Sequence, residues 1–412
     1  MEPAPAPSAA RGVRTAIVVA ALGYFVDIYD LVLFGVVRVA SLEGLGLSGE
    51  ALLDRGVFLI NAQMAGMLVG GVVWGVLGDR RGRKSVLFGS IVLYSLANLA
   101  NAAVTSVPMY AVLRFVAGVG LAGELGAGVT LVSELMRRET RGLGTVAIAG
   151  VGTLGAVVAG LVGDLLPWRM AYVVGGLLGL ALLALRVGVA ESGMFQTTRS
   201  QAGVRHGAFL ALFASRDRAL RYAACVLVGL PIWYAVGVLV LLAPELALAL
   251  DVQGAVTAGW AILVCYLGLS VGDVASGLVS QAWRSRRRAM LGFILALQGV
   301  VLAYLLSRGL SARAFYGLCF AVGFFAGYWA VFMTNAAEQF GTNLRATVTT
   351  TVPNVVRGAV VPITLAFTAW KGALGLPGSA LAVGAVCTVL ALAALAVLPE
   401  RFDADLDYVE PL

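Results

Sequence analysis

The chain has 412 residues, of which 60% are hydrophobic and only 12% are charged, with a formal net charge of +7. Soluble domains carry about 25% charged residues, so this composition excludes an ordinary water-soluble protein. The basic residues lie in short clusters between apolar runs, which argues against a nucleic-acid-binding protein. The four cysteines fall inside apolar runs without metal-ligand or disulfide spacing, and we expect neither a metal nor a cofactor.

Apolar runs of about 20 residues, long enough to cross a bilayer, recur along the whole chain. Hydropathy and helix breakers predict twelve spans. In chain order these are 13–37, 56–78, 85–105, 108–136, 143–166, 169–190, 220–245, 255–281, 288–307, 313–338, 346–370 and 376–398. We therefore expect an all-α polytopic membrane protein with an N-terminal six-helix bundle at 1–190, a polar linker at 191–219 and a C-terminal six-helix bundle at 220–412.

Arginine and lysine concentrate in the segments that follow the even-numbered spans, among them Arg80, Arg137, Arg216, Arg284 and Arg345. The opposite segments hold only Arg38, Arg55, Arg169, Arg308, Arg313 and Lys371. Cytoplasmic loops are enriched in positive residues, so we expect both termini in the cytoplasm and the chain in the inner (plasma) membrane. The acidic tail at 399–412 is expected to be solvated.

Two stretches of the chain repeat one plan. The segment after the second span reads Gly75-Val-Leu-Gly-Asp79-Arg80-Arg81-Gly82-Arg83-Lys84, and the segment after the eighth span is a degraded copy that ends Arg284-Ser-Arg286. At one constant offset, Gly123, Glu134 and Arg141 recur as Gly327, Glu338 and Arg345. Parallel halves of this kind place a midplane cavity between two rocking bundles, so alternating access follows as a hypothesis.

The segment Gly75 to Lys84 resembles the signature loop of the major facilitator superfamily, G-x-L-x-D-R-x-G-R-K. The resemblance implies the major facilitator fold, with two pseudo-symmetric bundles, and a conformational latch. The residues assigned to the latch are Gly75, Asp79, Arg80, Gly82, Arg83, Glu134, Arg141, Glu338 and Arg345. An aspartate at a helix end can pair with arginines of a neighbouring helix. An ordinary positive-inside loop would explain the arginines but not the acid flanked by glycines.

Six charged residues lie inside predicted spans, where each costs about 2.5 to 3.5 kcal/mol on insertion scales and needs a partner or a function. They are Asp27, Asp30, Arg114, Glu124, Asp273 and Arg357. Asp27 and Asp30 are three residues apart and share one face of the first span. Two such carboxyls in a low dielectric are suited to loading and releasing a proton. The alternative is that Arg114 neutralises both of them structurally.

Two spans carry distinctive runs of residues: the first reads Gly23-Tyr24-Phe-Val-Asp27-Ile-Tyr29-Asp30-Leu, and the fourth runs from Arg114 through Glu124 to Gly128. These spans resemble those of metabolite:proton and sialic-acid-type symporters. In these relatives such acids and the arginine form the proton-handling cluster, which implies that role for Asp27, Asp30, Arg114 and Glu124. The fourth span lacks the glycine-aspartate-tyrosine run of phosphate symporters, so inorganic phosphate is only an alternative substrate.

Arg357 lies near the middle of the eleventh span, where a positive charge requires a cavity or a counter-ion. A guanidinium binds carboxylate or phosphate through two parallel hydrogen bonds, which favours an anionic solute. The alternative is a structural ion pair between Arg357 and Asp273. The other residues predicted to line the cavity are Asp273, Trp233, Tyr234, Tyr328, Trp329, Asn335 and Asn354.

These features predict a proton-coupled symporter of a small organic anion, working as a monomer in the lipid bilayer. A drug or metabolite exporter driven by protons is an alternative, although the fifth span lacks the proline of the familiar antiporter pattern. A membrane enzyme or a receptor would need a Ser/His/Asp, metal or cysteine constellation, and the single histidine, His206, lies in the linker. A channel would leave the buried charges unexplained.

Overall fold

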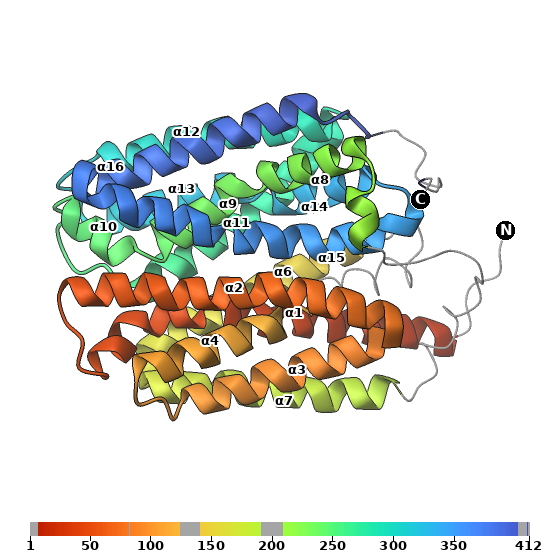
Figure 1. The fold of residues 1–412 in the computed structure, drawn as a ribbon, viewed down its shortest axis with the longest axis horizontal. Coiled ribbons are helices and arrows are strands. Elements are labelled where there is room, and N and C mark those ends of the chain that lie inside the picture. Colours follow the sequence, from red (N-terminus) through yellow and green to blue (C-terminus); the bar gives the residue numbers. More distant parts are fainter. Residues whose placement is uncertain (1–6, 82, 124–140, 191–208, 403–409, 411–412) are drawn as a thin grey trace.

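The computed structural model describes residues 7–81, 83–123, 141–190, 209–402 and 410, and the described part is almost entirely helical. The helices up to residue 190 lie side by side as one bundle in the lower part of Figure 1. They are α1 (Pro7–Glu43), α2 (Glu50–Arg81), α3 (Arg83–Asn101), α4 (Val107–Leu121), α6 (Arg141–Leu165) and α7 (Trp168–Ala190).

The helices from residue 209 onward form a second bundle, which lies above the first in Figure 1. Its first residues, 209–219, fall inside the range predicted as a polar linker. Its elements are η2 (Phe209–Phe213), α8 (Arg216–Val228), α9 (Leu230–Tyr234), the π-helical η3 (Ala235–Val240), α10 (Ala243–Ala249), α11 (Ala258–Ala282), α12 (Arg286–Leu306), α13 (Ala312–Ala326), α14 (Trp329–Glu338), α15 (Thr342–Gly358) and α16 (Val360–Val397). The two bundles meet where α1, α2 and α6 pack against α11, α15 and α16. Within the described ranges, seven helices are long and apolar enough to cross a membrane.

Local sequence explains where many of these helices begin. The side chains of Ser106, Ser215, Thr257, Ser285 and Ser311 each accept a hydrogen bond from a backbone amide in the first turn of the helix that follows. Such caps satisfy amides that have no partner inside the helix. These residues stand at the ends of apolar runs and therefore set the length of each span.

Glycines set the close packing inside each bundle. A side chain added at Gly66 or Gly70 of α2 would meet the backbone of α4 at Phe115 or Val119. The C-terminal bundle repeats this device, because a side chain at Gly268 or Gly272 of α11 would meet the backbone of α13. Small residues allow membrane helices to approach this closely.

Three of the predicted spans are interrupted. The seventh is divided into α8, α9 and η3 around Pro231, whose ring removes a backbone donor. The tenth is divided into α13 and α14 by Gly327 and Tyr328, which have non-helical torsion angles. The eleventh is divided into α15, which ends at Gly358, and the first part of α16. α16 then continues into the twelfth span through Gly375, where a positive φ of 69° bends the chain.

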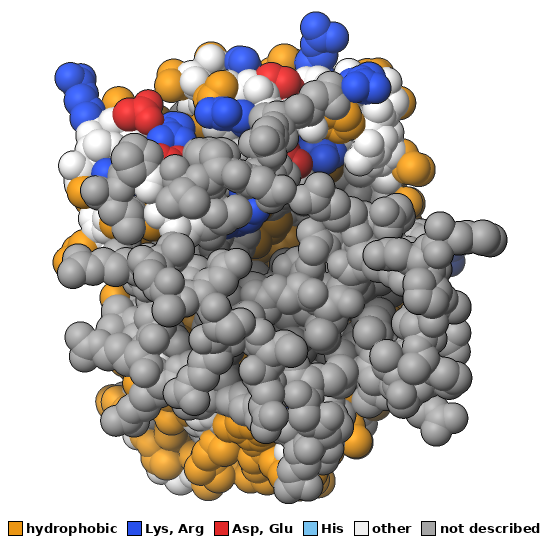
Figure 2. All heavy atoms as spheres, turned by 90° about the vertical axis from the view of Figure 1, so that its right-hand side faces the viewer, with side chains coloured by type: hydrophobic (Ala, Val, Ile, Leu, Met, Phe, Trp, Pro, Cys, Tyr) orange, Lys and Arg blue, Asp and Glu red, His pale blue; other side chains and the backbone are white. Residues whose placement is uncertain are grey.

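The end of the molecule at which α1 begins and α16 ends is called the proximal end here, and the opposite end is called the distal end. Figure 2 looks at the proximal end and shows arginine side chains gathered over the C-terminal bundle. Exposed residues of this group include Arg216, Arg284 and Arg288.

Polar contacts join the two bundles at the distal end. The buried Arg38 of α1 forms an ion pair with Glu245 of α10 at 2.6 Å. Lys371 of α16 forms an ion pair with Asp54 of α2 at 2.7 Å. Closer to the middle, the Thr364 hydroxyl donates to the side-chain oxygen of Asn61 at 2.6 Å. The structure therefore has its distal end closed.

Candidate functional site

Arg357 joins the two bundles at the middle of the molecule. It lies on α15, and its side chain is 1% exposed. Its Nη2 atom is 3.8 Å from Oδ2 of Asp27, which lies on α1 and is fully buried. Of the two predicted uses of Arg357, the structural pairing with Asp273 is replaced by a pairing with Asp27 across the bundle interface. Removing either partner alone from such a buried pair is strongly destabilising, because the other charge is left buried without a counter-ion.

Two tryptophans stand beside the Arg357 guanidinium. Its carbon Cζ is 5.5 Å from the ring centre of Trp233 and 5.9 Å from the ring centre of Trp329. The two rings are 6.3 Å apart and inclined by 70°. Cations are attracted to aromatic faces at these distances. Trp233 comes from α9 and Trp329 is the first residue of α14, so two of the interrupted spans, the seventh and the tenth, each contribute a wall to the site.

Two tyrosines complete the surroundings of the ion pair. Tyr24 lies one turn before Asp27 on α1, and it interacts electrostatically with Arg357, Asp27 and Asp273. The Trp329 indole is a hydrogen-bond partner of its hydroxyl. Tyr266 of α11 is buried and interacts electrostatically with Arg357, Tyr24 and Asp27. Neither tyrosine was predicted as a site residue, although the three-residue spacing places Tyr24 on the same helix face as Asp27.

Asp30 and Arg114 form a separate buried cluster inside the N-terminal bundle. The Asp30 carboxyl faces Arg114 and Asn98 and packs against Gly175 of α7. The Arg114 Nη2 atom donates to Asn98 Oδ1 at 2.8 Å. The guanidinium also lies 4.8 Å from the ring centre of Tyr172. Asp30 therefore faces Arg114, whereas Asp27 forms an ion pair with Arg357.

Other residues predicted to line the cavity are bonded elsewhere. The Tyr234 hydroxyl donates to the Ala380 carbonyl at 2.7 Å, and the Tyr328 hydroxyl donates to the Val228 carbonyl at 2.9 Å. Asn335 accepts a hydrogen bond from Gln339. Asn354 lies one turn before Arg357 and donates to the Ala122 carbonyl of the N-terminal bundle at 3.0 Å. Asn354 is thus a second buried contact between the bundles.

The latch prediction is described only in part. Glu338 forms an ion pair with Arg286 at 3.2 Å, so the degraded second loop supplies a partner for this acid. Arg345 donates to the Ala337 carbonyl at 3.2 Å, and Gly75 lies within α2. The side chains of Asp79, Arg80, Arg83 and Arg141 and the whole of Gly82, Glu124 and Glu134 lie outside the described residues.

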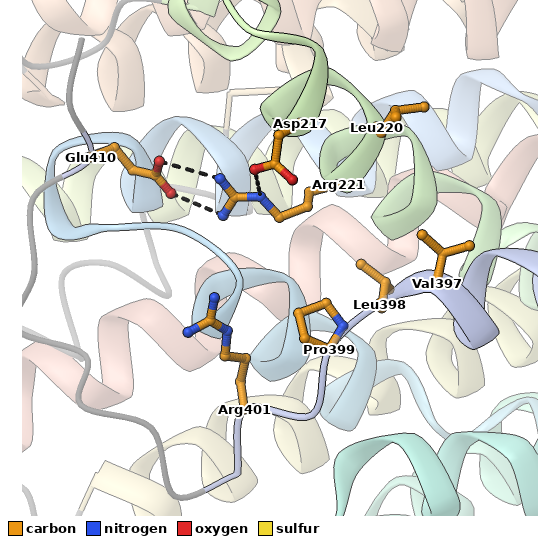
Figure 3. Close-up of a pocket in the computed structure, with 8 residues that line it drawn as sticks. All are labelled: Asp217, Leu220, Arg221, Val397, Leu398, Pro399, Arg401 and Glu410. Carbon is orange, nitrogen blue, oxygen red and sulfur yellow. Dashed lines mark hydrogen bonds and ion pairs between the residues drawn. The ribbon is translucent and has the colours of Figure 1, made fainter.

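A pocket at the proximal end has a volume of about 390 Å³ and is lined by the C-terminal bundle and its tail (Figure 3). Arg221 of α8 holds both carboxylate oxygens of Glu410 there, at 3.0 and 3.3 Å. Asn343 exchanges two hydrogen bonds with the Glu410 backbone. Glu400 also accepts hydrogen bonds from the amides of Arg286 and Arg287. The expectation of a solvated tail is therefore wrong for Glu410, which is buried against Arg221, whereas Glu400 is exposed to solvent while it accepts its hydrogen bonds.

Residues 20–363 match the sequence model of the protein family described as the Major Facilitator Superfamily. The chain belongs to this superfamily of transporters. The structure of XylE, a proton:xylose symporter of the superfamily, superposes with a TM-score of 0.73 at 17% identity and covers 97% of this chain and 98% of that one. The described helices thus belong to the twelve-helix fold in two bundles that the sequence predicted, and the protein is a multi-pass membrane protein.

Curated relatives in the superfamily have names that state their substrates. The chain is 30% identical to the 3-(3-hydroxy-phenyl)propionate transporter of Escherichia coli over 71% of its length and 73% of that protein. It is 28% identical to the gentisate transporter of Corynebacterium glutamicum over 89% and 83%, respectively. The match to the niacin transporter NiaP of Acinetobacter baylyi, at 33% identity, covers 36% of this chain, which spans about a third of that relative.

Proposed function

We propose that this transporter is a proton-coupled symporter of small organic anions, and that its substrates are aromatic carboxylates. The observation that carries the proposal is the buried ion pair of Asp27 and Arg357 beside two tryptophan rings. The names of the relatives, which refer to hydroxyphenylpropionate, gentisate and niacin, support the aromatic class.

Coupling arises in this proposal because two carboxylates compete for one guanidinium. While Asp27 is ionised, it engages Arg357. When a proton neutralises Asp27, Arg357 becomes a buried cation without a counter-ion, which is unfavourable until an anion arrives. A substrate carboxylate then binds the planar guanidinium through two hydrogen bonds. Proton and anion therefore load together, and the empty carrier restores the original pair.

The tryptophans give the proposed site its preference for rings. Trp233 and Trp329 offer aromatic faces next to the carboxylate-binding atom, and aromatic pairs gain energy from offset or edge-to-face contact. Tyr24 and Tyr266 place hydroxyl groups near the same point. A ring hydroxyl on the substrate can exchange hydrogen bonds with such groups, which is an effective basis for selectivity.

Alternating access would require the bundles to separate at one end at a time. The contacts Arg38–Glu245 and Asp54–Lys371 close the distal end, so distal opening must break both. We place the proximal end in the cytoplasm, because its exposed arginines follow the positive-inside rule for a protein of the inner membrane. The boundaries 1–190, 191–219 and 220–412 are proposed for the two moving bundles and the linker, within one monomer.

Two further groups of residues have proposed roles. Asp30 and Arg114, together with Glu124, would form a second proton-handling cluster inside the N-terminal bundle. The acid and arginines of Gly75 to Arg83, with Glu134 and Arg141, would latch the proximal end. Glu338 and Arg345 would hold the equivalent place in the other bundle, where Glu338 contacts Arg286.

The test is uptake into proteoliposomes that contain the purified transporter. We expect labelled gentisate and 4-hydroxybenzoate to accumulate when an inward proton gradient is imposed, whereas 4-hydroxybenzamide, which lacks the carboxylate, should not. Arg357→Ala should abolish accumulation, and Arg357→Lys, which keeps the charge but loses the planar fork, should restore only part of it. Accumulation that ignores the gradient, or equal uptake of the amide, would contradict the proposal.

A further inference from the structure

Asp273 is a buried carboxyl at the middle of α11 that binds backbone amides rather than Arg357. Its side chain is 8% exposed. Its Oδ1 atom accepts a hydrogen bond from the Ala330 amide at 3.0 Å, and the Trp329 amide also donates to the carboxyl. Both amides belong to the first turn of α14, so the carboxyl of one helix lies at the N-terminus of another.

The interruption between α13 and α14 creates the need for this contact. Gly327 has φ −73° and ψ 45°, and Tyr328 has φ −106° and ψ 17°, so the helical hydrogen-bond ladder is broken there. The first amides of a helix lack partners within it, and the membrane interior offers no water to replace them. The Tyr328 hydroxyl is directed to the Val228 carbonyl. The N-cap residue, Tyr328, makes no side-chain cap of its own, so Asp273 of α11 caps the N-terminus of α14 in its place, where a negative charge is favoured.

Glycine contacts fix the height of Asp273 relative to the break. A side chain at Gly272 would meet the backbone of Phe324, and one at Gly327 would meet the backbone amide of Asp273. α11 is therefore in backbone contact with the end of α13, directly before the capped turn of α14. Neither helix can slide along the other without moving the carboxyl away from the α14 amides.

The residue whose amide is held is also a wall of the proposed substrate site. Trp329 begins α14, and its ring is 5.9 Å from the Arg357 guanidinium and 6.3 Å from the Trp233 ring. Its indole also reaches the Tyr24 hydroxyl in the opposite bundle. The placement of the α14 N-terminus thus determines the placement of this ring.

We propose that Asp273 is a positioning residue that holds Trp329 against the anion site through the cap of α14. It sets the preference for aromatic over aliphatic carboxylates and does not itself bind the anion or carry the transported proton. This inference rests on the proposed function for the identity of the substrate. The role of the cap in placing Trp329 can be measured independently of any substrate.

The experiment compares Asp273→Asn with Asp273→Ala in the full-length transporter. Asparagine keeps an oxygen that can accept the two amide hydrogen bonds, whereas alanine removes the cap. We expect Asp273→Asn to retain gradient-driven gentisate uptake, with a KM within about threefold of wild type. Asp273→Ala should raise the KM for gentisate by about tenfold, because the displaced Trp329 no longer offers its face to the gentisate ring. The change for succinate, which has no ring, should be smaller. Ser276→Ala, one turn along α11, is the matched control.

The readout without substrate is the fluorescence of Trp329, obtained by subtracting the spectrum of the corresponding Trp329→Phe protein. We expect its emission to shift in Asp273→Ala and to stay unchanged in Asp273→Asn, whichever solutes the protein transports. If Asp273→Asn loses uptake while its emission is unchanged, the charge itself is required and the positioning role is wrong. An unchanged emission and KM in Asp273→Ala would also overturn it. If Asp273→Ala does not fold, the uptake by Asp273→Asn decides.

Discussion

The substitution Asp27→Asn tests the competition between proton and substrate for Arg357. Asparagine has nearly the shape of aspartate but leaves the guanidinium, which is 1% exposed, without its charged partner. Removing one member of a buried pair costs about 3–5 kcal/mol, and the N···O distance of 3.8 Å indicates the lower end, about 3 kcal/mol. If the substrate anion recovers this free energy, it binds up to about 100-fold more tightly to the variant at high pH.

The more specific signature is the dependence of affinity on pH. In the wild-type protein one proton accompanies each anion, so the apparent Kd should fall about tenfold for each unit of decreasing pH while Asp27 is ionised in the empty carrier. The Kd of Asp27→Asn should not change with pH, because the competing charge is absent. Both slopes can be measured in detergent by quenching of tryptophan fluorescence with gentisate between pH 6 and pH 8, on the order of two decades of proton activity.

Asp54→Asn is the control for the same chemical change in another ion pair, because Asp54 pairs with Lys371 at the distal end. We expect it to keep the wild-type slope. The reasoning is refuted if Asp27→Asn retains the pH dependence of the wild-type protein. Weaker binding in Asp27→Asn at every pH would mean that Asp27 contacts or places the substrate itself.

Three further predictions concern the contact that closes the distal end, the tryptophan beside Arg357 and the C-terminal tail. Glu245→Gln removes the charge that pairs with the buried Arg38, so distance distributions between spin labels on the distal loops of the two bundles should broaden toward longer values. Trp233→Leu removes one face from Arg357, and a loss of about 0.5–2 kcal/mol predicts a KM for gentisate about 2- to 30-fold higher in uptake assays. Burial opposes ionisation of Glu400, but hydrogen bonds from the Ser285 hydroxyl and from backbone amides outweigh it and lower the pKa of this carboxyl. The ionised carboxylate therefore stabilises the fold at pH values above the ordinary glutamate pKa, and this stabilisation is lost as the pH falls through the lowered pKa of Glu400. Glu400→Gln should reduce the melting temperature at neutral pH and have less effect in acid.

Much of the fold was predictable because membrane spans have a strong sequence signal. Runs of about 20 apolar residues, the polar linker and the repeated spacing of Gly123 and Gly327 predicted the two-bundle architecture. The interruption of the tenth span was not predicted, since Gly327 alone does not end a helix. The break is stable because Asp273, on another helix, accepts the amides that it frees. Such a cap depends on tertiary contact and leaves no local pattern.

The candidate site was predictable as a set of residues but not as an arrangement. The cost of burying charge singled out Asp27 and Arg357 separately. Their pairing could not be inferred, because they lie on different bundles and hydropathy gives no information on which helix faces meet. The same reason explains why Asp27 and Asp30, placed on one helix face by spacing, engage Arg357 and Arg114 respectively. Trp329 was a candidate because it is an aromatic residue inside a predicted span, but only the break before α14 brings its ring to Arg357.

The most direct test of coupling is to follow proton movement that is driven by the substrate alone. Proteoliposomes containing a pH-sensitive dye would receive external gentisate with no proton gradient imposed. Vesicles with the Arg357→Ala protein give the background from passive entry of the undissociated acid. The account predicts internal acidification above that background for the wild-type protein, and none for Asp27→Asn even if gentisate still enters. Gentisate entry through the wild-type protein without acidification above the background would contradict proton-coupled symport.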